Sequence, residues 1–142
     1  MKFVIVIILF LLSWVETSFS QVAVVAHLSV PLEKIEKSEL LDFYTGDIRK
    51  WRDDQPVIVF DLKPRGEVKE TFYKFLGKSS SCMKSIWMKK VLSGEGDPPD
   101  SMNSEEELLK SVAATLGAIG FVSQSQVTGN VKTLLLIGKE RK

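Results

Sequence analysis

The stretch that most constrains the fold is residues 56–77, PVIVFDLKPRGEVKETFYKFLG, which reads as a strand, a loop and a helix. Residues 57–60 (VIVF) form an unbroken β-branched and aromatic run, typical of a strand that is buried on both faces. Apolar residues then recur with helical spacing and end at a glycine: Val68, Phe72, Phe75, Leu76 and Gly77. The stretch therefore predicts an α/β arrangement.

The loop of this stretch, residues 61–66, is the first candidate for a ligand site. It follows the carboxyl end of a strand and precedes the amino end of a helix. Open α/β sheets hold their ligands in this position. A small ligand, if the chain binds one, is expected here.

The rest of the chain predicts one α/β domain. Three further apolar runs indicate strands, at residues 22–26, 118–122 and 131–137. Helices are expected from Ser38, as N-cap, to Gly46, after the serines at 79–81, and after the capping pair of Ser104 and Glu107. The first strand, first helix and 57–60 strand form a βαβ unit, so the two strands are expected to be parallel neighbours. The prediction is four strands and about four helices, with a mostly parallel sheet.

The first 20 residues are typical of a secretory signal. Met1 and Lys2 are followed by an apolar run over residues 3–12 and by small residues at 18–20. Cleavage before Gln21 would leave residues 21–142 as one exported domain, in the periplasm or secreted. The alternative is an uncleaved anchor, but the apolar run is short against the roughly 20 residues that a spanning helix needs.

Charge and reactive residues argue against several functions. The net charge is +1, whereas a general nucleic-acid binder usually carries a marked basic excess. The lone cysteine, Cys82, lies in an apolar helical pattern and is expected in the core. The lone histidine, His27, ends an apolar strand and is expected to pack there or at its rim. No spacing indicates a metal site, a cofactor or a catalytic nucleophile, so the chain is expected not to be an enzyme.

Several segments come in the order and rough spacing of one known family. They are residues 43–46 (FYTG) with Trp51, the strand VIVFDL, the helix end FYKFLG, Trp87 with residues 91–94 (VLSG), and residues 116–122 (LGAIGFV). The chain resembles the periplasmic phosphate-binding proteins of ABC transporters, which have a type 2 periplasmic-binding-protein domain. It looks like a short member with a single lobe. Independently of the resemblance, Gly117 and Gly120 are expected to be a helix stop and a close strand contact, and Trp51 and Trp87 to pack in the core or at its rim.

The candidate loop departs from the family's pattern. In these phosphate binders an arginine follows the corresponding strand and precedes a run of small, hydroxyl-bearing residues. An ungapped register puts Leu62 at the arginine position and residues 65–68 (RGEV) in the small run, so neither feature carries over. What remains is two cations, Lys63 and Arg65, and the amino end of a helix at Gly66, Glu67 and Val68, where Glu67 competes for the positive end. A solvated loop without a ligand is the alternative.

The expected function is that of an exported, non-catalytic solute-binding protein for phosphate or another small anion. Ser29, after the first strand, is expected to add a hydroxyl from a neighbouring carboxyl end of the sheet. One lobe offers half a pocket, so tight capture would need a second copy in a homodimer or an envelope or transporter partner. The alternative function is a protein-interaction module of the cell envelope that keeps the lobe and has lost the ligand.

Overall fold

The computed structural model describes residues 21–138, so the predicted signal at 1–20 and the tail at 139–142 lie outside the described residues. The described strands are β1 (Val22–His27), β2 (Ile58–Leu62), β3 (Asp100–Met102), β4 (Ala118–Ser123) and β5 (Val131–Ile137). The helices are α2 (Lys37–Thr45), α3 (Glu67–Leu76), α4 (Ser80–Leu92), α5 (Glu105–Ala114) and the 3₁₀ turn η1 (Gln124–Gln126). Between residues 21 and 138, no helix is long and apolar enough to cross a membrane.

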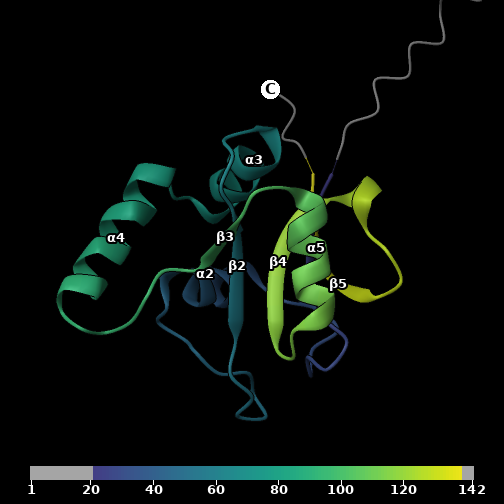
Figure 1. Ribbon diagram of the computed structural model, residues 1–142, viewed down its shortest axis with the longest axis horizontal. Coiled ribbons are helices and arrows are strands. Elements are labelled where there is room, and N and C mark those ends of the chain that lie inside the picture. Colours follow the sequence, from purple (N-terminus) through teal and green to yellow (C-terminus); the bar gives the residue numbers. More distant parts are fainter. Residues whose placement is uncertain (1–20, 139–142) are drawn as a thin grey trace, which may run out of the picture.

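The described strands form one five-stranded sheet in the order β3-β2-β4-β1-β5 (Figure 1). β2 pairs in parallel with β3 and β4, whereas β1 runs antiparallel to both β4 and β5. Four strands therefore point one way and β1 points the other, which confirms a mostly parallel α/β sheet.

The predicted βαβ unit is wrong. β4 lies between β1 and β2, so the two strands are not neighbours. β2 is parallel to β4 and β1 is antiparallel to β4, so β1 and β2 run in opposite directions. An apolar run predicts a buried strand, and residues 22–26 are indeed all buried. The run carries no information on direction, which here depends on a strand that is almost 100 residues further along the chain.

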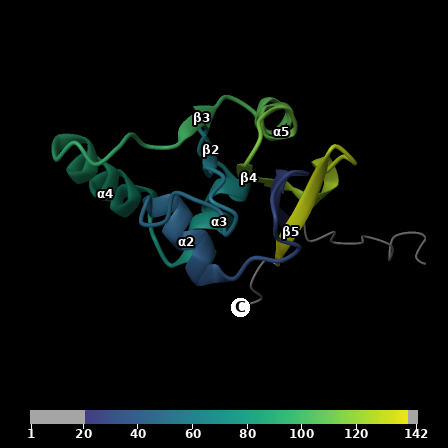
Figure 2. The same cartoon turned by 90° about the horizontal axis from the view of Figure 1, so that it is seen from below.

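Helices cover both faces of the sheet, and β4 shows how. Gly120 faces α5, because a Cβ added there would lie 2.6 Å from Leu108 Cδ2. The next residue, Phe121, points to the opposite face and stacks on Phe72 of α3 with ring centroids 3.9 Å apart. Figures 1 and 2 show the same three layers, with α5 on one face and α2 and α3 on the other.

Tyr44 of α2 joins the helical layer to the sheet. Its ring packs edge-on against Phe72 at 4.8 Å, and its buried hydroxyl donates a hydrogen bond of 2.8 Å to the Phe60 carbonyl in β2. The predicted helix stops at Gly46 and Gly77 are confirmed, since both have left-handed backbone. The predicted cap at Ser38 is wrong, because α2 begins earlier and its N-cap is Glu36.

Helix α4 stands apart from the sheet (Figure 1). Ser79 caps it as expected, with its hydroxyl accepting from the Cys82 amide, but the only fully buried residue that the structure describes in this helix is Met83. Cys82 is exposed, so its predicted place in the core is wrong. Met83 belongs to the core and Ile86 packs against it, whereas Met88, Val91 and Leu92 are exposed beside a cavity.

Candidate functional site

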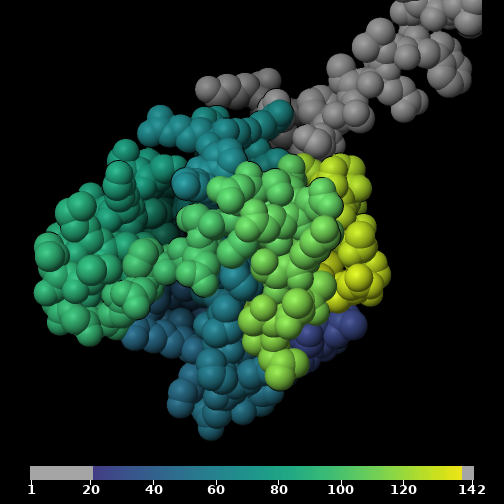
Figure 3. All heavy atoms as spheres, viewed as in Figure 1, coloured from purple at the N-terminus to yellow at the C-terminus, as the bar shows by residue number. Residues whose placement is uncertain are grey.

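A cavity of about 590 Å³ lies between α4 and the β2-β3 side of the domain. It begins where β2 ends and extends along α4 to the segment that precedes β3. β2 contributes Asp61, β3 contributes Ser101, α3 contributes Lys69 and Tyr73, and α4 and the loops supply the rest of the wall. The surface is hollowed between α4 and the body of the domain (Figure 3). This is the carboxyl edge of parallel strands, where α/β folds hold ligands.

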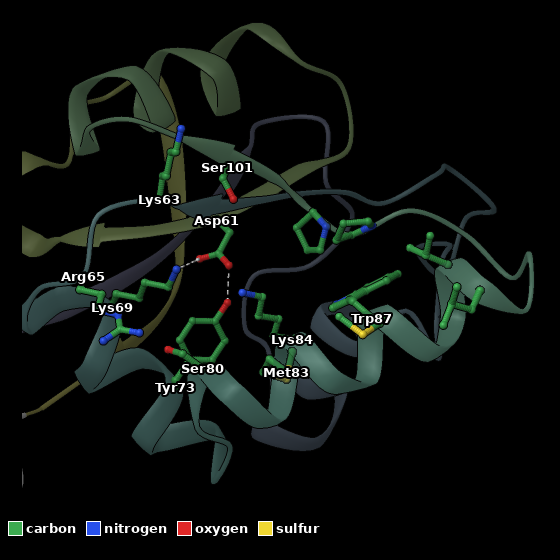
Figure 4. Close-up of a pocket in the computed structure, with 15 residues that line it drawn as sticks. Asp61, Lys63, Arg65, Lys69, Tyr73, Ser80, Met83, Lys84, Trp87 and Ser101 are labelled. Carbon is green, nitrogen blue, oxygen red and sulfur yellow. Dashed lines mark hydrogen bonds and ion pairs between the residues drawn. The ribbon is translucent and has the colours of Figure 1, made fainter.

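Asp61 forms the polar base of the cavity (Figure 4). It is part of β2, not of the loop, and one carboxylate oxygen accepts a hydrogen bond of 2.7 Å from the Leu62 amide. The other oxygen accepts from the Tyr73 hydroxyl, and Lys69 Nζ lies 4.0 Å from Asp61 Oδ1. Both oxygens of the Asp61 carboxylate thus already have hydrogen-bond partners, one from β2 and one from α3.

The carboxylate of Asp61 helps to keep Tyr73 protonated and lies near the amine of Lys69. Burial raises the pKa of Tyr73 well above its usual range, and the negative charge of Asp61 and their hydrogen bond raise it further. Lys69 Nζ donates a hydrogen bond of 2.6 Å to the Leu62 carbonyl, and this bond fixes the Lys69 amine against β2. Tyr73 is therefore a neutral hydrogen-bond donor, and Lys69 a positioned cation.

Three further cations line the cavity. Lys63 and Arg65 were predicted from the sequence, and Lys84 was not. All three are exposed. Lys84 points from α4 into the cavity, and Arg65 lies beside the start of α3 (Figure 4). Asp61 is the one carboxylate in the described lining, so the cavity carries a net positive charge.

The remaining predicted residues lie outside this lining. Gly66 is the N-cap of α3, and Glu67 and Val68 are its first two residues. They lie beside Arg65 in the chain but do not face the cavity. Exposed Glu67 carries its negative charge in the first turn of α3, as expected.

Ser29 lies at the opposite edge of the sheet from the cavity. Its hydroxyl accepts from the Gly117 amide at 3.2 Å and from Gln55 Nε2 at 3.3 Å, at the beginning of β4 and before β2. His27 Nδ1 is 2.8 Å from the same oxygen, at the rim of the sheet as predicted for this histidine. The expectation that Ser29 joins Lys63 and Arg65 is wrong, because β1 runs antiparallel to β2.

Sequence reasoning missed several lining residues. Lys69 and Tyr73 are four residues apart on one face of α3, and that spacing, read with Asp61 at a strand end, could have indicated them. Ser80, Lys84 and Trp87 reach the cavity only because of how α4 docks. Ser101 comes from the short edge strand β3, for which the sequence has no apolar run.

Comparisons with known proteins agree with this fold. No family model matches the chain. No curated protein matches it in sequence. Among solved structures, a protein from Clostridium perfringens described as a phosphate ABC transporter substrate-binding protein with bound phosphate matches at TM-score 0.67 and 18% identity, over 82% of this chain and 44% of its own.

Two other structures give the same picture. An ABC-type phosphate transport receptor from Vibrio cholerae matches at TM-score 0.66 and 21% identity, over 82% of this chain and 46% of that one. PstS from Borrelia burgdorferi matches at TM-score 0.60 and 12% identity, over 83% and 48%. The chain spans less than half the length of each neighbour. At these identities the likeness concerns the fold alone: the chain has an α/β architecture similar to that of about half of each of these phosphate-binding proteins.

Proposed function

We propose that the chain is an exported, non-catalytic solute-binding protein that captures phosphate or a similar small oxyanion at the cationic rim of the cavity. The observation that carries the proposal is that Lys84 points into a cavity whose wall also includes Lys63 and Arg65, and whose only described carboxylate, Asp61, already has partners (Figure 4). Cations of this kind form strong charge-assisted hydrogen bonds with oxyanions. The fold neighbours, which are named as phosphate receptors and binding proteins, support the same class of ligand.

The geometry of the cavity also supports weak binding of the anion by the isolated chain. The cavity is open to solvent, and one lobe offers one wall, whereas closing lobes bury most of a ligand's surface. We therefore expect weak capture by the isolated chain. The positive end of the α3 dipole, at Gly66, Glu67 and Val68, lies next to Arg65 but outside the cavity wall, so it would add only a weak attraction, which the carboxylate of Glu67 would oppose. We also propose that the chain delivers the bound anion to an ABC-type transporter or to a partner in the cell envelope.

Titration of the purified chain with phosphate and with sulfate tests the binding. A ligand at 100 times its dissociation constant raises the free energy of unfolding by about 2.7 kcal/mol, which a thermal or urea transition detects. Lys84→Ala should weaken phosphate binding about 10-fold or more, because a hydrogen bond to a charged group contributes about 1.5–3 kcal/mol. Lys89→Ala is the matched control, since Lys89 is exposed on the same helix and is not part of the cavity wall.

Two results would contradict the proposal. The first is an unchanged transition at millimolar phosphate and sulfate, which would favour the interaction module. The second is an equal loss of affinity in Lys84→Ala and Lys89→Ala, which would mean that the anion binds the general charge of α4. Export is tested separately, by the mass of the secreted chain, which should begin at Gln21.

A further inference from the structure

The cavity is much larger than the oxyanion that its rim attracts. At about 30 Å³ per water molecule, its 590 Å³ corresponds to about 20 waters. A tetrahedral oxyanion is only a few waters in size, so it would occupy a small part of this volume. Cavities of this size usually hold whole organic ligands.

The wall of the cavity is divided into a polar and an apolar end. Asp61, Lys69 and Tyr73 lie at one end, and Trp87 lies toward the other (Figure 4). The apolar part of the wall comes from α4 and the segment that precedes β3: Met83, Trp87, Met88, Val91, Leu92, Pro98 and Pro99. A ligand that fills the cavity therefore needs two chemical parts.

Hydrogen bonds to the end of α2 hold α4 in position beside the cavity. Trp87 Nε1 donates a hydrogen bond of 2.9 Å to the Tyr44 carbonyl. Lys90 Nζ donates one hydrogen bond to the Thr45 carbonyl and another, of 2.8 Å, to the carboxylate of Asp47. These bonds fix one side of the helix while the cavity side stays uncovered. The exposed fractions are 56% for Met88, 47% for Val91 and 83% for Leu92. Exposed apolar groups gathered around one concave site are typical of a binding surface.

We propose that the cavity binds a phosphate monoester with an apolar alkyl or aryl group, the phosphate at Lys84, which points into the cavity, and the apolar group against Trp87, Val91 and Leu92. The charge of the rim selects the anionic head, and the α4 wall removes the apolar group from water. The proposal rests on the proposed function for its head group. It goes further by naming an organic ester as the ligand instead of inorganic phosphate alone.

A series of alkyl phosphates from methyl to hexyl, titrated by calorimetry beside inorganic phosphate, tests the proposal. Full burial of a methylene is worth about 0.8 kcal/mol, or about fourfold in affinity, and half burial about twofold. Hexyl phosphate should therefore bind at least about 30-fold tighter than methyl phosphate. The same gain in hexylammonium over methylammonium should be absent, because the rim is cationic.

Leu92→Ser should reduce the hexyl-to-methyl ratio, whereas Leu116→Ser should leave it unchanged. Leu116 is also exposed, at 66%, but lies outside the cavity. If inorganic phosphate binds and the alkyl series is flat, this inference is wrong and the proposed function stands. If neither phosphate nor the esters bind, both are wrong. Equal gains for phosphates and ammonium ions, or equal effects of the two variants, would reduce the site to a nonspecific apolar patch and overturn the inference.

Discussion

The two tyrosines of the chain, Tyr44 and Tyr73, are both buried in the helical layer next to β2. Burial is the main cause that raises the pKa of each phenol, and the charge of Asp61 raises both further. A raised pKa means that the folded state favours the neutral phenol. This contribution to stability is complete below about pH 10, the usual pKa, and is lost as the pH rises above it.

We expect no phenolate absorbance near pH 10 while the chain remains folded. The phenolate signal should instead appear together with the loss of far-UV circular dichroism, because only the unfolded chain ionises its tyrosines there. Tyr73→Phe should leave one phenol with the same behaviour. A phenolate that titrates near its usual pKa with the circular dichroism unchanged would show that at least one phenol is not buried in this way.

Some single residues were predictable because local geometry decides their role. Gly117 has left-handed backbone, and a Cβ there would lie 2.3 Å from the Pro56 carbonyl oxygen. Gly120 lets α5 approach β4. The predicted helix stop at Gly117 is wrong, because α5 ends at Ala114 with Thr115 as its C-cap, and Gly117 instead lies in the turn that leads into β4. The predicted close strand contact at Gly120 is confirmed. Trp51 is likewise a core residue, 2% exposed, and its indole nitrogen donates 2.9 Å to the Gly117 carbonyl.

At the scale of elements, α4 is where pattern and structure disagree. Met83, Ile86, Trp87 and Val91 have helical spacing, which predicted one buried face with Cys82 in the core. The spacing is correct, but α4 docks on the end of α2 and leaves most of that face beside the cavity. Periodicity identifies a helix, whereas its partner comes from the rest of the chain.

The exposed position of Cys82 leads to a prediction for α4. Its thiol should react with an aromatic disulfide reagent at nearly the same rate in the folded chain and in denaturant. Cys82→Ser should abolish the reaction and change the free energy of unfolding by no more than about 0.5 kcal/mol, as for other exposed positions. Strong protection of the thiol in the folded state would mean that α4 packs with its Cys82 side inward, and the cavity wall would then be different.

At the scale of the whole molecule, strand direction decided which site predictions succeeded. Lys63 and Arg65 were found because they directly follow β2, and the carboxyl end of a parallel strand is a local property. Ser29 was misassigned because β1 runs the other way. Lys84 and Ser101 meet the site only through the docking of α4 and the pairing of β3, which no local pattern encodes.

The position of β1 ties the two ends of the described chain together. β1 is the first described strand, yet it lies between β4 and β5, the last two, and Val24 opposite Phe121 and Leu135 is fully buried. Loss of packing at Val24 should therefore weaken the whole sheet instead of one edge. Such coupling is the basis of a single cooperative transition.

Val24→Ala should lower the free energy of unfolding by about 1.5–3 kcal/mol, because two buried methyl groups are removed and a cavity remains. Val91→Ala is the matched control, because Val91 is 47% exposed on α4, and it should cost well under half as much. Both variants are made in a Trp87→Phe background, so that buried Trp51 is the tryptophan of the described residues that emits, and urea unfolding is followed by circular dichroism and by this fluorescence. In Val24→Ala the two signals should shift to lower urea by the same amount, since Trp51 packs near β4 through Gly117. A shift in only one signal would mean that β1 and the region around Trp51 unfold independently, and the closure of the sheet by β1 would then not control the stability of the domain.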